Sequence, residues 1–336
     1  MRAFEIREFG ADPLVLTQRP EPVPGPGQVL VAMTAASLNY RDLLIAEGTY
    51  NPRLRLPLIP VSDGAGIVVE SGSGVALRPG DRVVPIFFQG WLDGDPSTEK
   101  LATGLGADLD GVLCEHRVFG EAGLLRVPDH LDDGEAAALP CAGVTAWSAV
   151  VKLGATKPGD VVLVQGTGGV ALFALQFAKL MGAEVILVSS SDEKLALAGA
   201  LGADHLINYR AEPDWSRSAK ALTNGRGADL VIEIGGAGTL HQSILAVRVG
   251  GTIAMIGVVA GAAASAVSLP LVVMRQVRMQ GVTLGSRSDF EAMLRAMTAN
   301  GMRPILDDRR FSFEEAPEAY RHLRAQAHVG KVVVTF

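Results

Sequence analysis

The sequence predicts an α/β chain in which a doubly wound parallel sheet is joined to a second, β-rich domain. Three observations predict it. The first 125 residues carry short β-like runs separated by proline and glycine. From residue 161 onward, apolar strand-like segments alternate with helical ones. The length of 336 residues exceeds the usual size of one domain, so two domains are expected.

The composition is that of a globular chain with a large core, since 48% of the residues are hydrophobic and 20% are charged. A net charge of −6 and scattered basic residues argue against non-specific binding to nucleic acid. Two cysteines, Cys114 and Cys141, are too few for a four-cysteine zinc site and make a disulfide framework improbable. Without a signal-like apolar start or a run approaching ~20 apolar residues, a soluble cytoplasmic protein is expected.

The first half of the chain contains short strands and few helices. Residues 20–28, PEPVPGPGQ, cannot form a helix, because proline removes amide donors and restricts the residue before it. Runs such as QVLVAMTAASL, AGIVVESG and DRVVPIFF are typical of strands. We assign residues 1–140 and 287–336 to this β-rich domain and residues 141–286 to the parallel-sheet domain.

The middle of the chain alternates strand and helix with short connections, which indicates a parallel sheet covered on both faces. The predicted strands are 161–165, 184–188, 205–208, 230–234 and 252–256, and the predicted helices are 169–181, 192–201, 214–223 and 239–247. The tail departs from this alternation, with helices at 290–299 and 314–325 and a final strand at 331–336. We expect the tail to pair back onto the first domain.

The segment VVLVQGTGGVA at 161–171 predicts a dinucleotide-binding turn. In a chain with 39 glycines, a plain strand-to-helix turn is the alternative. Here the glycines follow a predicted strand directly and open a predicted helix, which is the context that the motif requires. Gly166 permits the tight turn and Gly168 lets the backbone approach a pyrophosphate at the helix N-terminus. The predicted contacts are Gly166, Thr167, Gly168, Gly169 and Val170.

The end of the second strand favours NADPH over NADH. An NAD site usually places an acidic residue there to bind the ribose hydroxyls. This chain has Ser189 and Ser190 instead, which can donate hydrogen bonds to a 2′-phosphate. Lys194 could add positive charge, although a solvated helix face explains it nearly as well, and Tyr209 could close the adenine side. The nearby Asp192 weighs against this preference.

Taken together, these segments resemble the medium-chain dehydrogenase/reductase family across nearly the whole chain. The resemblance rests on PGQVLVAM, SLNYRDLL, RPGDRVV, KPGDVVLVQGTGGV, LGADHLINYR and HVGKVVVTF. It implies a Rossmann domain that binds the dinucleotide and a GroES-like domain that carries the substrate and catalytic residues. Within the family, the chain looks like the zinc-independent, quinone-oxidoreductase-like branch.

The resemblance also implies that catalytic zinc is absent. Zinc-dependent relatives carry a cysteine at the place of Asn39 and a His-Glu pair at the place of Ser62 and Asp63. Only Cys141 is kept in the region of a further ligand, and catalytic zinc needs three good ligands. We therefore expect no metal, and we expect Cys141 to be a small buried apolar residue.

The expected catalytic residues are Tyr50 and Asn39. The resemblance places Tyr50 where relatives keep a cleft tyrosine, although a rim residue packed on Pro52 is equally compatible with the sequence. Asn39 is expected near the nicotinamide, where its amide could donate a hydrogen bond. Further cofactor contacts are expected at Gly235 and Gly257, which follow strands, and at Ser286. Arg41 and Asp42 are expected to form a local pair.

The function predicted is zinc-independent hydride transfer from NADPH to a quinone or an α,β-unsaturated carbonyl compound. Without a metal, negative charge on the substrate oxygen must be stabilised by hydrogen bonds, which suits conjugated substrates. The alternatives are an alcohol dehydrogenase with residual metal and an NADPH-binding protein without catalysis. The aromatic loop at 87–91 either walls the substrate cleft or forms a satellite core. A homo-oligomer, dimer or tetramer, is expected, with the apolar stretch 258–273 as a possible interface.

Overall fold

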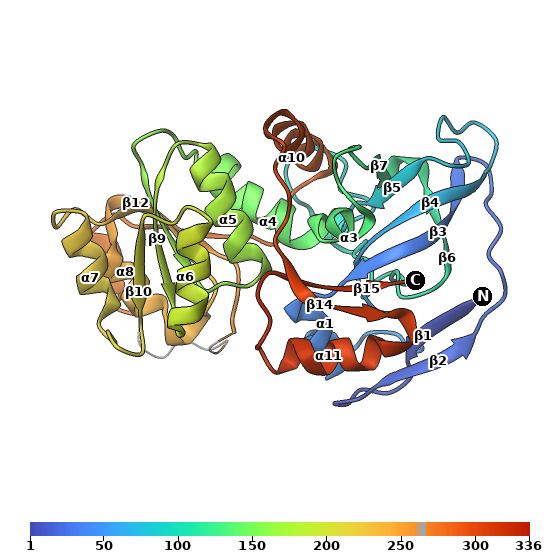
Figure 1. Cartoon of the computed structure of the whole chain (residues 1–336), viewed down its shortest axis with the longest axis horizontal. Coiled ribbons are helices and arrows are strands. Elements are labelled where there is room, and N and C mark those ends of the chain that lie inside the picture. The colour runs from blue at the N-terminus through green and yellow to red at the C-terminus, as the bar shows by residue number, and fades with distance from the viewer. Residues whose placement is uncertain (260, 262–266) are drawn as a thin grey trace. The chain divides into compact units, whose positions relative to one another are not determined.

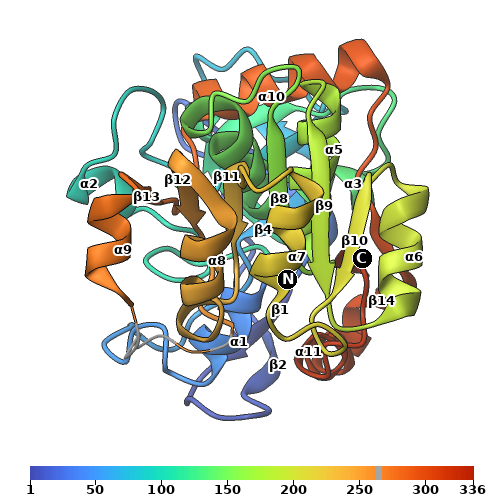
Figure 2. The ribbon, with the colours of Figure 1, turned by 90° about the vertical axis from the view of Figure 1, so that its left-hand side faces the viewer.

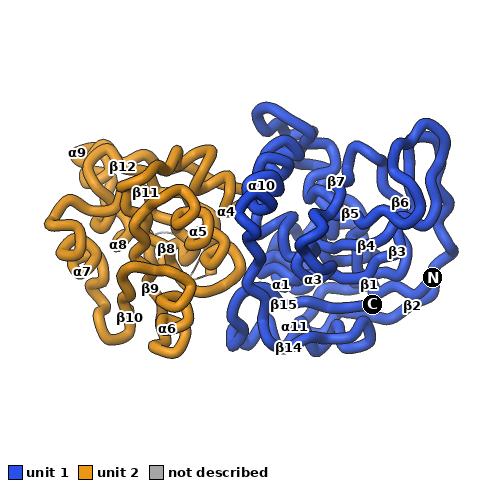
Figure 3. Tube along the Cα trace, turned by 45° about the horizontal axis from the view of Figure 1, so that its top comes forward, with its two compact units in different colours: residues 1–144, 285–336 blue, residues 145–284 orange. Residues whose placement is uncertain are grey.

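The computed structural model describes residues 1–259, 261 and 267–336. The chain divides into two compact units: unit 1 comprises residues 1–144 and 285–336, and unit 2 comprises residues 145–284 (Figure 3). Each unit is described by itself. Within the described residues, no helix is both long and apolar enough to cross a membrane.

Unit 1 is built on a seven-stranded, mainly antiparallel sheet (Figure 1). Its strand order is β14-β15-β3-β4-β5-β7, and β6 also pairs with β3. The strands are β3 (Gln28–Ser37), β4 (Asp63–Ser71), β5 (Arg82–Pro85), β6 (His116–Gly120), β7 (Leu124–Arg126), β14 (Leu306–Ser312) and β15 (Lys331–Thr335). A separate hairpin joins β1 (Arg2–Ile6) and β2 (Leu14–Gln18). The helices are α1 (Tyr40–Ala46), α2 (Thr98–Leu101), α3 (Asp133–Ala137), α10 (Arg287–Asn300) and α11 (Ala316–Arg324).

The tail of the chain returns to the sheet of unit 1, as predicted. Strand β15 pairs antiparallel with β3, with Val333 opposite Ser37. Strand β14, which pairs parallel with β15, is not among the predicted strands. Its sequence LDDRRFS lacks a strand-like apolar pattern, because four of its seven residues are charged and a register shift interrupts the pairing.

Unit 2 contains a six-stranded, fully parallel sheet in the order β10-β9-β8-β11-β12-β13 (Figure 2). The strands are β8 (Val161–Gln165), β9 (Glu184–Ser189), β10 (His205–Asn208), β11 (Ala228–Glu233), β12 (Val247–Met255) and β13 (Arg278–Gly281). The helices are α5 (Gly169–Leu180), α6 (Asp192–Ala200), α7 (Trp215–Leu222), α8 (Leu240–Ala246) and α9 (Leu269–Met274). In chain order the strands run 3-2-1-4-5-6, the order of dinucleotide-binding sheets, whose topological switch point lies between β8 and β11.

Apolar side chains cover both faces of this sheet. Val161 and Leu163 of β8 belong to one core cluster with Trp215 of α7 and Ile244 of α8. Since strand side chains alternate, Val162 lies on the opposite face, and it too is fully buried. The predicted alternation of strands and helices is therefore confirmed. Strand β13 is not among the predicted strands, because its polar sequence RMQG gives no apolar signal.

The stretch 258–273, considered as an interface, lies only partly within the described residues. Residues 260 and 262–266 fall outside them. Among the described residues, Leu269 is 69% exposed and Val273 is 72% exposed, so helix α9 presents apolar side chains to its surroundings. Strand β13 lies at the edge of the sheet, beside this segment in sequence.

Candidate functional site

The turn between β8 and α5 has the geometry that a pyrophosphate requires. Gly166 has a φ of 81°, a conformation that favours glycine, and its amide donates to the carbonyl of Val188 in the neighbouring strand at 2.7 Å. Gly168 is extended and precedes the twelve-residue helix α5. A methyl group added at Gly166 or Gly168 would meet nothing within 4 Å. The space that their missing side chains leave open is free for a ligand.

The five residues predicted to hold the pyrophosphate are brought together at this turn. Thr167 is buried, Gly169 and Val170 form the first turn of α5, and all five precede or open the helix. The first amides of an α-helix lack intrahelical acceptors, and the helix dipole adds positive potential at that end. The residues present therefore fit a dinucleotide, with phosphate oxygens as acceptors for these amides.

The end of β9 carries the residues predicted to recognise the adenosine ribose. Ser189 is 3% exposed and its carbonyl accepts from the Tyr209 amide, whereas Ser190 is half-buried. The Tyr209 side chain is 44% exposed at the end of β10, and Lys194 lies half-buried in the first turn of α6. Asp192 accepts a hydrogen bond of 2.6 Å from the Asn208 amide group, so this acidic group is already partnered.

A buried polar network, which sequence reasoning missed, ties β8 to β11 behind the glycine turn. The Gln165 side chain accepts from the Ile234 and Gly235 amides and donates to Glu233 Oε2 at 2.8 Å. Glu233 is fully buried and also accepts from the amide of Gly236. The hydroxyls of Thr239 and Ser243 donate to the same carboxyl group. The sequence feature that could have indicated this network is a polar residue at the end of each of two apolar strands, Gln165 in β8 and Glu233 in β11.

Gly235 and Gly257, predicted to contact the cofactor, follow β11 and β12. A methyl group on Gly235 would come within 2.3 Å of Thr239 Oγ1, and one on Gly257 would come within 2.3 Å of the Ile234 carbonyl. Both glycines are therefore required by packing within the chain. Their proximity places the two loops side by side beyond the carboxyl ends of adjacent strands, where open parallel sheets bind ligands.

Ser286 lies in unit 1, whereas the other predicted cofactor residues lie in unit 2. It is 1% exposed and caps α10: its hydroxyl and its amide both donate to Asp289 Oδ2 at 2.8 Å. Its carbonyl accepts from the Phe290 amide. The structure thus gives Ser286 a helix-capping role that its sequence position did not predict.

Asn39 lies directly before α1 in unit 1 and is 9% exposed. Its amide donates to Asp42 Oδ2 at 2.8 Å, while its side-chain oxygen accepts from Lys331 Nζ at 2.5 Å. Burial raises the pKa of Asp42 to about 6, against the opposing effects of Arg41 and the Asn39 amide. The predicted pairing of Arg41 with Asp42 is confirmed, at 3.7 Å. Lys331 was not predicted from the sequence to be a member of this site. The only indication in the sequence is that a lysine stands directly before the apolar run VVVTF.

Asp63 completes this buried cluster. It is fully buried, accepts from the Ser62 hydroxyl at 2.7 Å and from the Cys141 amide at 3.0 Å, and lies 3.7 Å from Lys331 Nζ. Cys141 is only partly buried as a residue, but burial raises the pKa of its thiol well above the usual value, and Asp63 adds to the rise. Among the described residues, no three His, Cys, Asp or Glu side chains form a group that could hold a metal ion.

The side chains around Asn39 do not fit a zinc ion. Lys331 Nζ bonds Asn39 and lies near Asp63, so a fixed positive charge already stands between two of the positions at which ligands would be needed. A dication there would be repelled by the ammonium group in a buried, weakly screened environment. Neutral Asn39 and Ser62 are also poor substitutes for the thiolate and imidazole that zinc prefers.

Tyr50 is 46% exposed and lies beyond α1. The Arg41 guanidinium stacks over the Tyr50 ring at 5.1 Å and over the Phe87 ring at 4.6 Å, measured to the ring centroids. It also donates to the Leu105 carbonyl at 3.1 Å. Arg41 therefore connects the tyrosine to the aromatic loop, and no contact with Pro52 is required to hold the ring.

The aromatic loop forms a satellite core within unit 1. Phe87, Phe88 and Trp91 are 4%, 6% and 5% exposed, and the Phe87 and Phe88 rings lie edge to face with centroids 4.6 Å apart. These values support the structural alternative over an open wall for substrate. The loop continues as a turn that approaches the segment before β4: a methyl group on Gly111 would come within 2.1 Å of the Val61 carbonyl.

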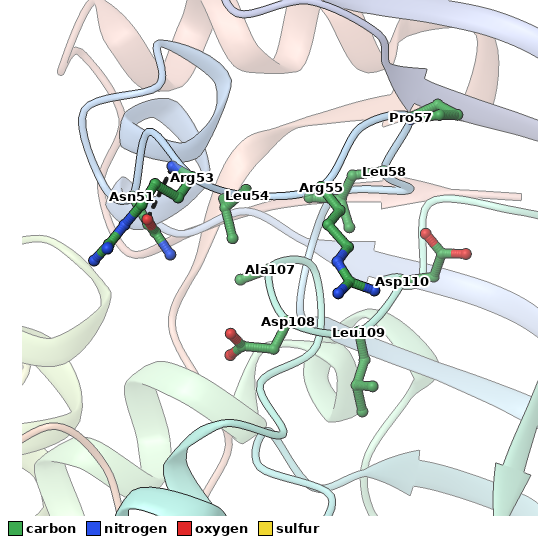
Figure 4. A pocket seen from close by; sticks show the side chains of 10 residues that line it. All are labelled: Asn51, Arg53, Leu54, Arg55, Pro57, Leu58, Ala107, Asp108, Leu109 and Asp110. Atoms are coloured by element: carbon green, nitrogen blue, oxygen red, sulfur yellow. Dashed lines mark hydrogen bonds between the residues drawn. The ribbon is translucent and has the colours of Figure 1, made fainter.

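A polar pocket of about 420 Å³ opens in unit 1 between the segment after α1 and the loop at 107–110 (Figure 4). Arg53 and Arg55 line it, and neither guanidinium has an ion pair or hydrogen bond with the residues that the structure describes. Asp108 and Asp110 line it as well; Asp110 is paired with Arg19 at 3.1 Å. The two guanidinium groups point to different sides, Arg55 toward the loop at 107–110 and Arg53 away from it, so they are two separate candidate contacts for a ligand (Figure 4).

Comparison with protein families finds two matches. The family described as "Alcohol dehydrogenase GroES-like domain" matches residues 25–129, and the family described as "Zinc-binding dehydrogenase" matches residues 169–299. The two matches lie one on each side of the predicted domain boundary between residues 140 and 141.

Individual relatives extend over nearly the whole chain. A zinc-type alcohol dehydrogenase-like protein of Schizosaccharomyces pombe is 45% identical over 315 residues, covering 92% of this chain and 91% of the relative. An acryloyl-coenzyme A reductase of Metallosphaera sedula is 29% identical, covering 99% of this chain and 97% of its own. A putative alcohol dehydrogenase from Sinorhizobium meliloti, known as a crystal structure, is 44% identical with a TM-score of 0.92, over 100% of this chain and 98% of that one.

Proposed function

Because the chain belongs to the medium-chain dehydrogenase/reductase superfamily and is an NAD(P)H-dependent oxidoreductase, we propose that it reduces a quinone or an α,β-unsaturated carbonyl compound with NADPH and without a catalytic metal. The observation that carries this proposal is the Lys331 ammonium group on Asn39, where a zinc-dependent relative would need a ligand. We assign cofactor binding to unit 2 and the binding of the substrate oxygen to unit 1.

The chemistry needs an anchor for negative charge. Bound NADPH would supply a hydride to the β-carbon of an enone, and the electrons of the double bond would then move to the carbonyl oxygen. Conjugation spreads this charge, so hydrogen-bond donors can stabilise it without a Lewis acid. We propose that Asn39 is this donor and that Tyr50, half-exposed and held by Arg41, supplies a second hydrogen bond or the final proton.

The proposed preference for NADPH rests on Ser189 and Ser190, with Lys194 and Tyr209 as further contacts. No acidic residue at the end of β9 faces a 2′-phosphate, and Asp192 is already bonded to Asn208. Another solved structure, a crystal structure of an NAD-dependent alcohol dehydrogenase, is 35% identical, so relatedness alone does not argue for NADPH. The glycines of the phosphate turn serve either dinucleotide.

The test combines binding, turnover and metal content. We expect NADPH to bind at least about tenfold more tightly than NADH in calorimetric titration, a difference of about 1.4 kcal/mol. Purified protein is expected to oxidise NADPH with quinones or enones and to keep this activity after dialysis against a chelator. Stoichiometric zinc together with chelator-sensitive oxidation of simple alcohols would instead identify a metal-dependent alcohol dehydrogenase. NADPH binding without turnover on the whole panel would indicate a non-catalytic protein.

A narrower candidate substrate is an α,β-unsaturated acyl thioester of coenzyme A, favoured by Arg53 and Arg55. The two guanidinium groups lie unpaired at a pocket of about 420 Å³, and guanidinium is a strong partner for phosphate. The phosphates of coenzyme A are such a ligand, and one relative is named an acryloyl-coenzyme A reductase.

The Arg53→Ala/Arg55→Ala protein separates the two substrate classes. We expect its KM for an enoyl thioester of coenzyme A to rise about tenfold or more, because two charge-assisted contacts are lost. Its KM for a small quinone is expected to stay within twofold, which controls for damage to the site. An equal change with both substrates, or none with either, would remove the thioester from consideration.

We also propose that the protein is a homodimer that uses α9 and the edge strand β13. Leu269, Val273 and Met274 are 69%, 72% and 79% exposed, an apolar surface that a partner would cover. Val273→Asp is expected to halve the mass measured by light scattering, because a charge on a covered apolar surface destabilises association. Arg217→Glu, on α7, reverses a charge elsewhere on unit 2 and is expected to leave the mass unchanged.

A further inference from the structure

We propose that Lys331 is a positioning residue that fixes the Asn39 amide as a hydrogen-bond donor and adds the positive charge of the oxygen-binding site. This inference rests on the proposed function, in which Asn39 receives the substrate oxygen. It assigns to the first residue of β15, nearly 300 residues along the chain from Asn39, a direct part in the same reaction.

The ammonium group is held in one place by three oxygen atoms. Lys331 is 3% exposed, and its Nζ donates to the Leu38 carbonyl at 2.7 Å and to Asn39 Oδ1 at 2.5 Å. Asp63 Oδ2 lies 3.7 Å away. A lysine is rarely this buried unless it is paired, and its long side chain loses much rotamer freedom in such a place. The stabilising contacts leave Nζ fixed against the Asn39 side chain.

The contact determines which way the Asn39 amide points. An ammonium group has hydrogens to donate and no lone pair to accept, so only the side-chain oxygen of Asn39 can face Lys331. The side-chain nitrogen must then point away. That nitrogen, Nδ2, is buried and has no hydrogen-bond partner among the described residues.

A buried NH₂ group without a partner is unfavourable by about 1–3 kcal/mol and is uncommon in folded proteins. Within the part of the chain that the structure describes, only the side-chain NH₂ group of Asn39 is left without a partner. The backbone amide of Asn39 donates to Asp42 Oδ2, and its carbonyl accepts from the Asp42 amide. Such a reserved donor is what a carbonyl ligand requires, because a ligand oxygen supplies the acceptor that the protein withholds. The ammonium on the other end of the amide polarises its N–H bonds toward that acceptor.

The same cluster accounts for the charge of the site. Asp63 is buried and needs compensation, which the Ser62 hydroxyl, the Cys141 amide and the Lys331 ammonium provide. Asp42, fully buried on the other side of Asn39, faces Arg41 at 3.7 Å. Two acidic groups are thus matched by two cationic ones, so no uncompensated carboxylate opposes the negative charge that develops on a substrate oxygen at Nδ2.

The proposed step balances without further reactants. NADPH, held by the glycine turn of unit 2, would supply the hydride that forms the new C–H bond at the β-carbon of the enone, and it would be left as NADP⁺. The π electrons move to the oxygen, which is held as an enolate by Asn39 Nδ2. A proton from water or Tyr50 then returns to the α-carbon or, for a quinone, to the oxygen. Lys331 and Asn39 keep their own protons throughout.

Three variants isolate this role. Asn39→Asp keeps an oxygen for Lys331, replaces the NH₂ donor by a second oxygen and adds a carboxyl group to the buried cluster. Lys331→Met removes the ammonium, and Lys331→Arg keeps the charge. The rate constant of single-turnover NADPH oxidation with a quinone is expected to fall about 100-fold in Asn39→Asp and about 10- to 100-fold in Lys331→Met. Lys331→Arg is expected to recover most of the loss. The Kd for NADPH should stay within threefold in all three.

The single-turnover measurement distinguishes positioning from stability. A variant that merely unfolds in part gives a smaller amplitude with an unchanged rate constant, whereas lost positioning lowers the rate constant itself. Cys114→Ala is the matched control, since it disturbs the core of unit 1 at a fully buried cysteine without touching the cluster. Rate constants equal to that of the original protein in Asn39→Asp and Lys331→Met would overturn the inference.

A second measurement needs no turnover. The Asn39 side-chain amide signals of ¹⁵N-labelled protein, assigned by their loss in Asn39→Asp, are expected to shift when a saturated ketone such as cyclohexanone is added with NADP⁺. In Lys331→Met the shift should be reduced at least severalfold. An unmoved signal in the original protein contradicts the role of Asn39 and Lys331. Lack of turnover with every quinone and enone contradicts the proposed function instead, so the two failures are distinguishable.

Discussion

Gly168→Val is expected to leave folding unchanged and to weaken NADPH binding at least about 100-fold, or about 2.7 kcal/mol. Gly168 has a φ of −79° and a ψ of −179°, which any residue adopts. A side-chain carbon there meets no atom of the protein within 4 Å. The added methyl groups would instead occupy the space before α5 that the pyrophosphate needs. Loss of two charge-assisted hydrogen bonds accounts for the size of the effect.

Thermal unfolding and fluorescence titration of the same preparation check this result. The expected outcome is an unchanged melting temperature in the absence of cofactor and the loss of the increase that saturating NADPH produces in the original protein. A variant that binds NADPH normally would show that the glycine turn is an ordinary strand-to-helix connection.

Substitutions at two further glycines distinguish the effect of backbone strain on stability from the effect on NADPH binding. Gly166 and Gly159 have φ values of 81° and 87°, and a methyl group added at either one would meet no atom within 4 Å. Alanine at either position is therefore expected to destabilise unit 2 by about 1 kcal/mol, through its backbone conformation alone. Only Gly166→Ala should also weaken NADPH binding, because Gly159 lies in the turn before β8. Equal loss of affinity in both would attribute the binding defect to instability.

The strand, glycine turn and helix that are expected to bind phosphate could be predicted from the sequence because they are contiguous. The strand, the three glycines and the helix that follows lie within residues 161–180. Local patterns of this kind can be recognised in the sequence without knowledge of the fold. The same holds for the alternation of strands and helices between residues 161 and 256. Strands β13 and β14 could not be predicted, because edge strands with polar or charged sequences carry no apolar alternation.

The cluster around Asn39 could be predicted only in part, because its members are far apart in sequence. The places of ligands in relatives point to Asn39 and Asp63, but Lys331 joins them only through the pairing of β15 with β3. Sequence patterns do not report such long-range contacts. Ser286 has a role that the sequence did not predict: its amide and its hydroxyl donate to Asp289 and cap α10, while the cofactor contact expected there stays a prediction.

The Gln165–Glu233 network could not be predicted either, because its residues are also far apart in the sequence. Each residue ends an apolar strand, and each taken singly could be solvent-exposed. Only the adjacency of β8 and β11 in the sheet brings their side chains together. This adjacency is the topological switch point, so the network sits behind the site at which a dinucleotide is expected.

Glu233→Ala is accordingly expected to destabilise unit 2 strongly, by about 3 kcal/mol. Glu233 is fully buried and accepts four hydrogen bonds, from Gln165, Gly236, Thr239 and Ser243, with no cationic side chain within ion-pair distance among the described residues. Alanine would leave a cavity and a buried amide group without an acceptor, and each unsatisfied group is unfavourable by about 1–3 kcal/mol. A fall of roughly 10 °C in melting temperature follows for a unit of this size.

Glu233→Gln tests whether hydrogen bonding or volume dominates. Glutamine keeps the shape and one acceptor oxygen but turns a donor toward groups that already donate, so an intermediate loss of about 1–2 kcal/mol is expected. Glu184→Ala in strand β9 of the same sheet is the control. Its side chain is 44% exposed and pairs with His205, and surface pairs contribute at most about 1 kcal/mol. Scanning calorimetry of the three variants ranks them. If Glu233→Ala had the same melting temperature as Glu184→Ala, the Glu233 carboxyl group would not be what holds the loop after β11. The position of that loop beside the glycine turn would then need another explanation.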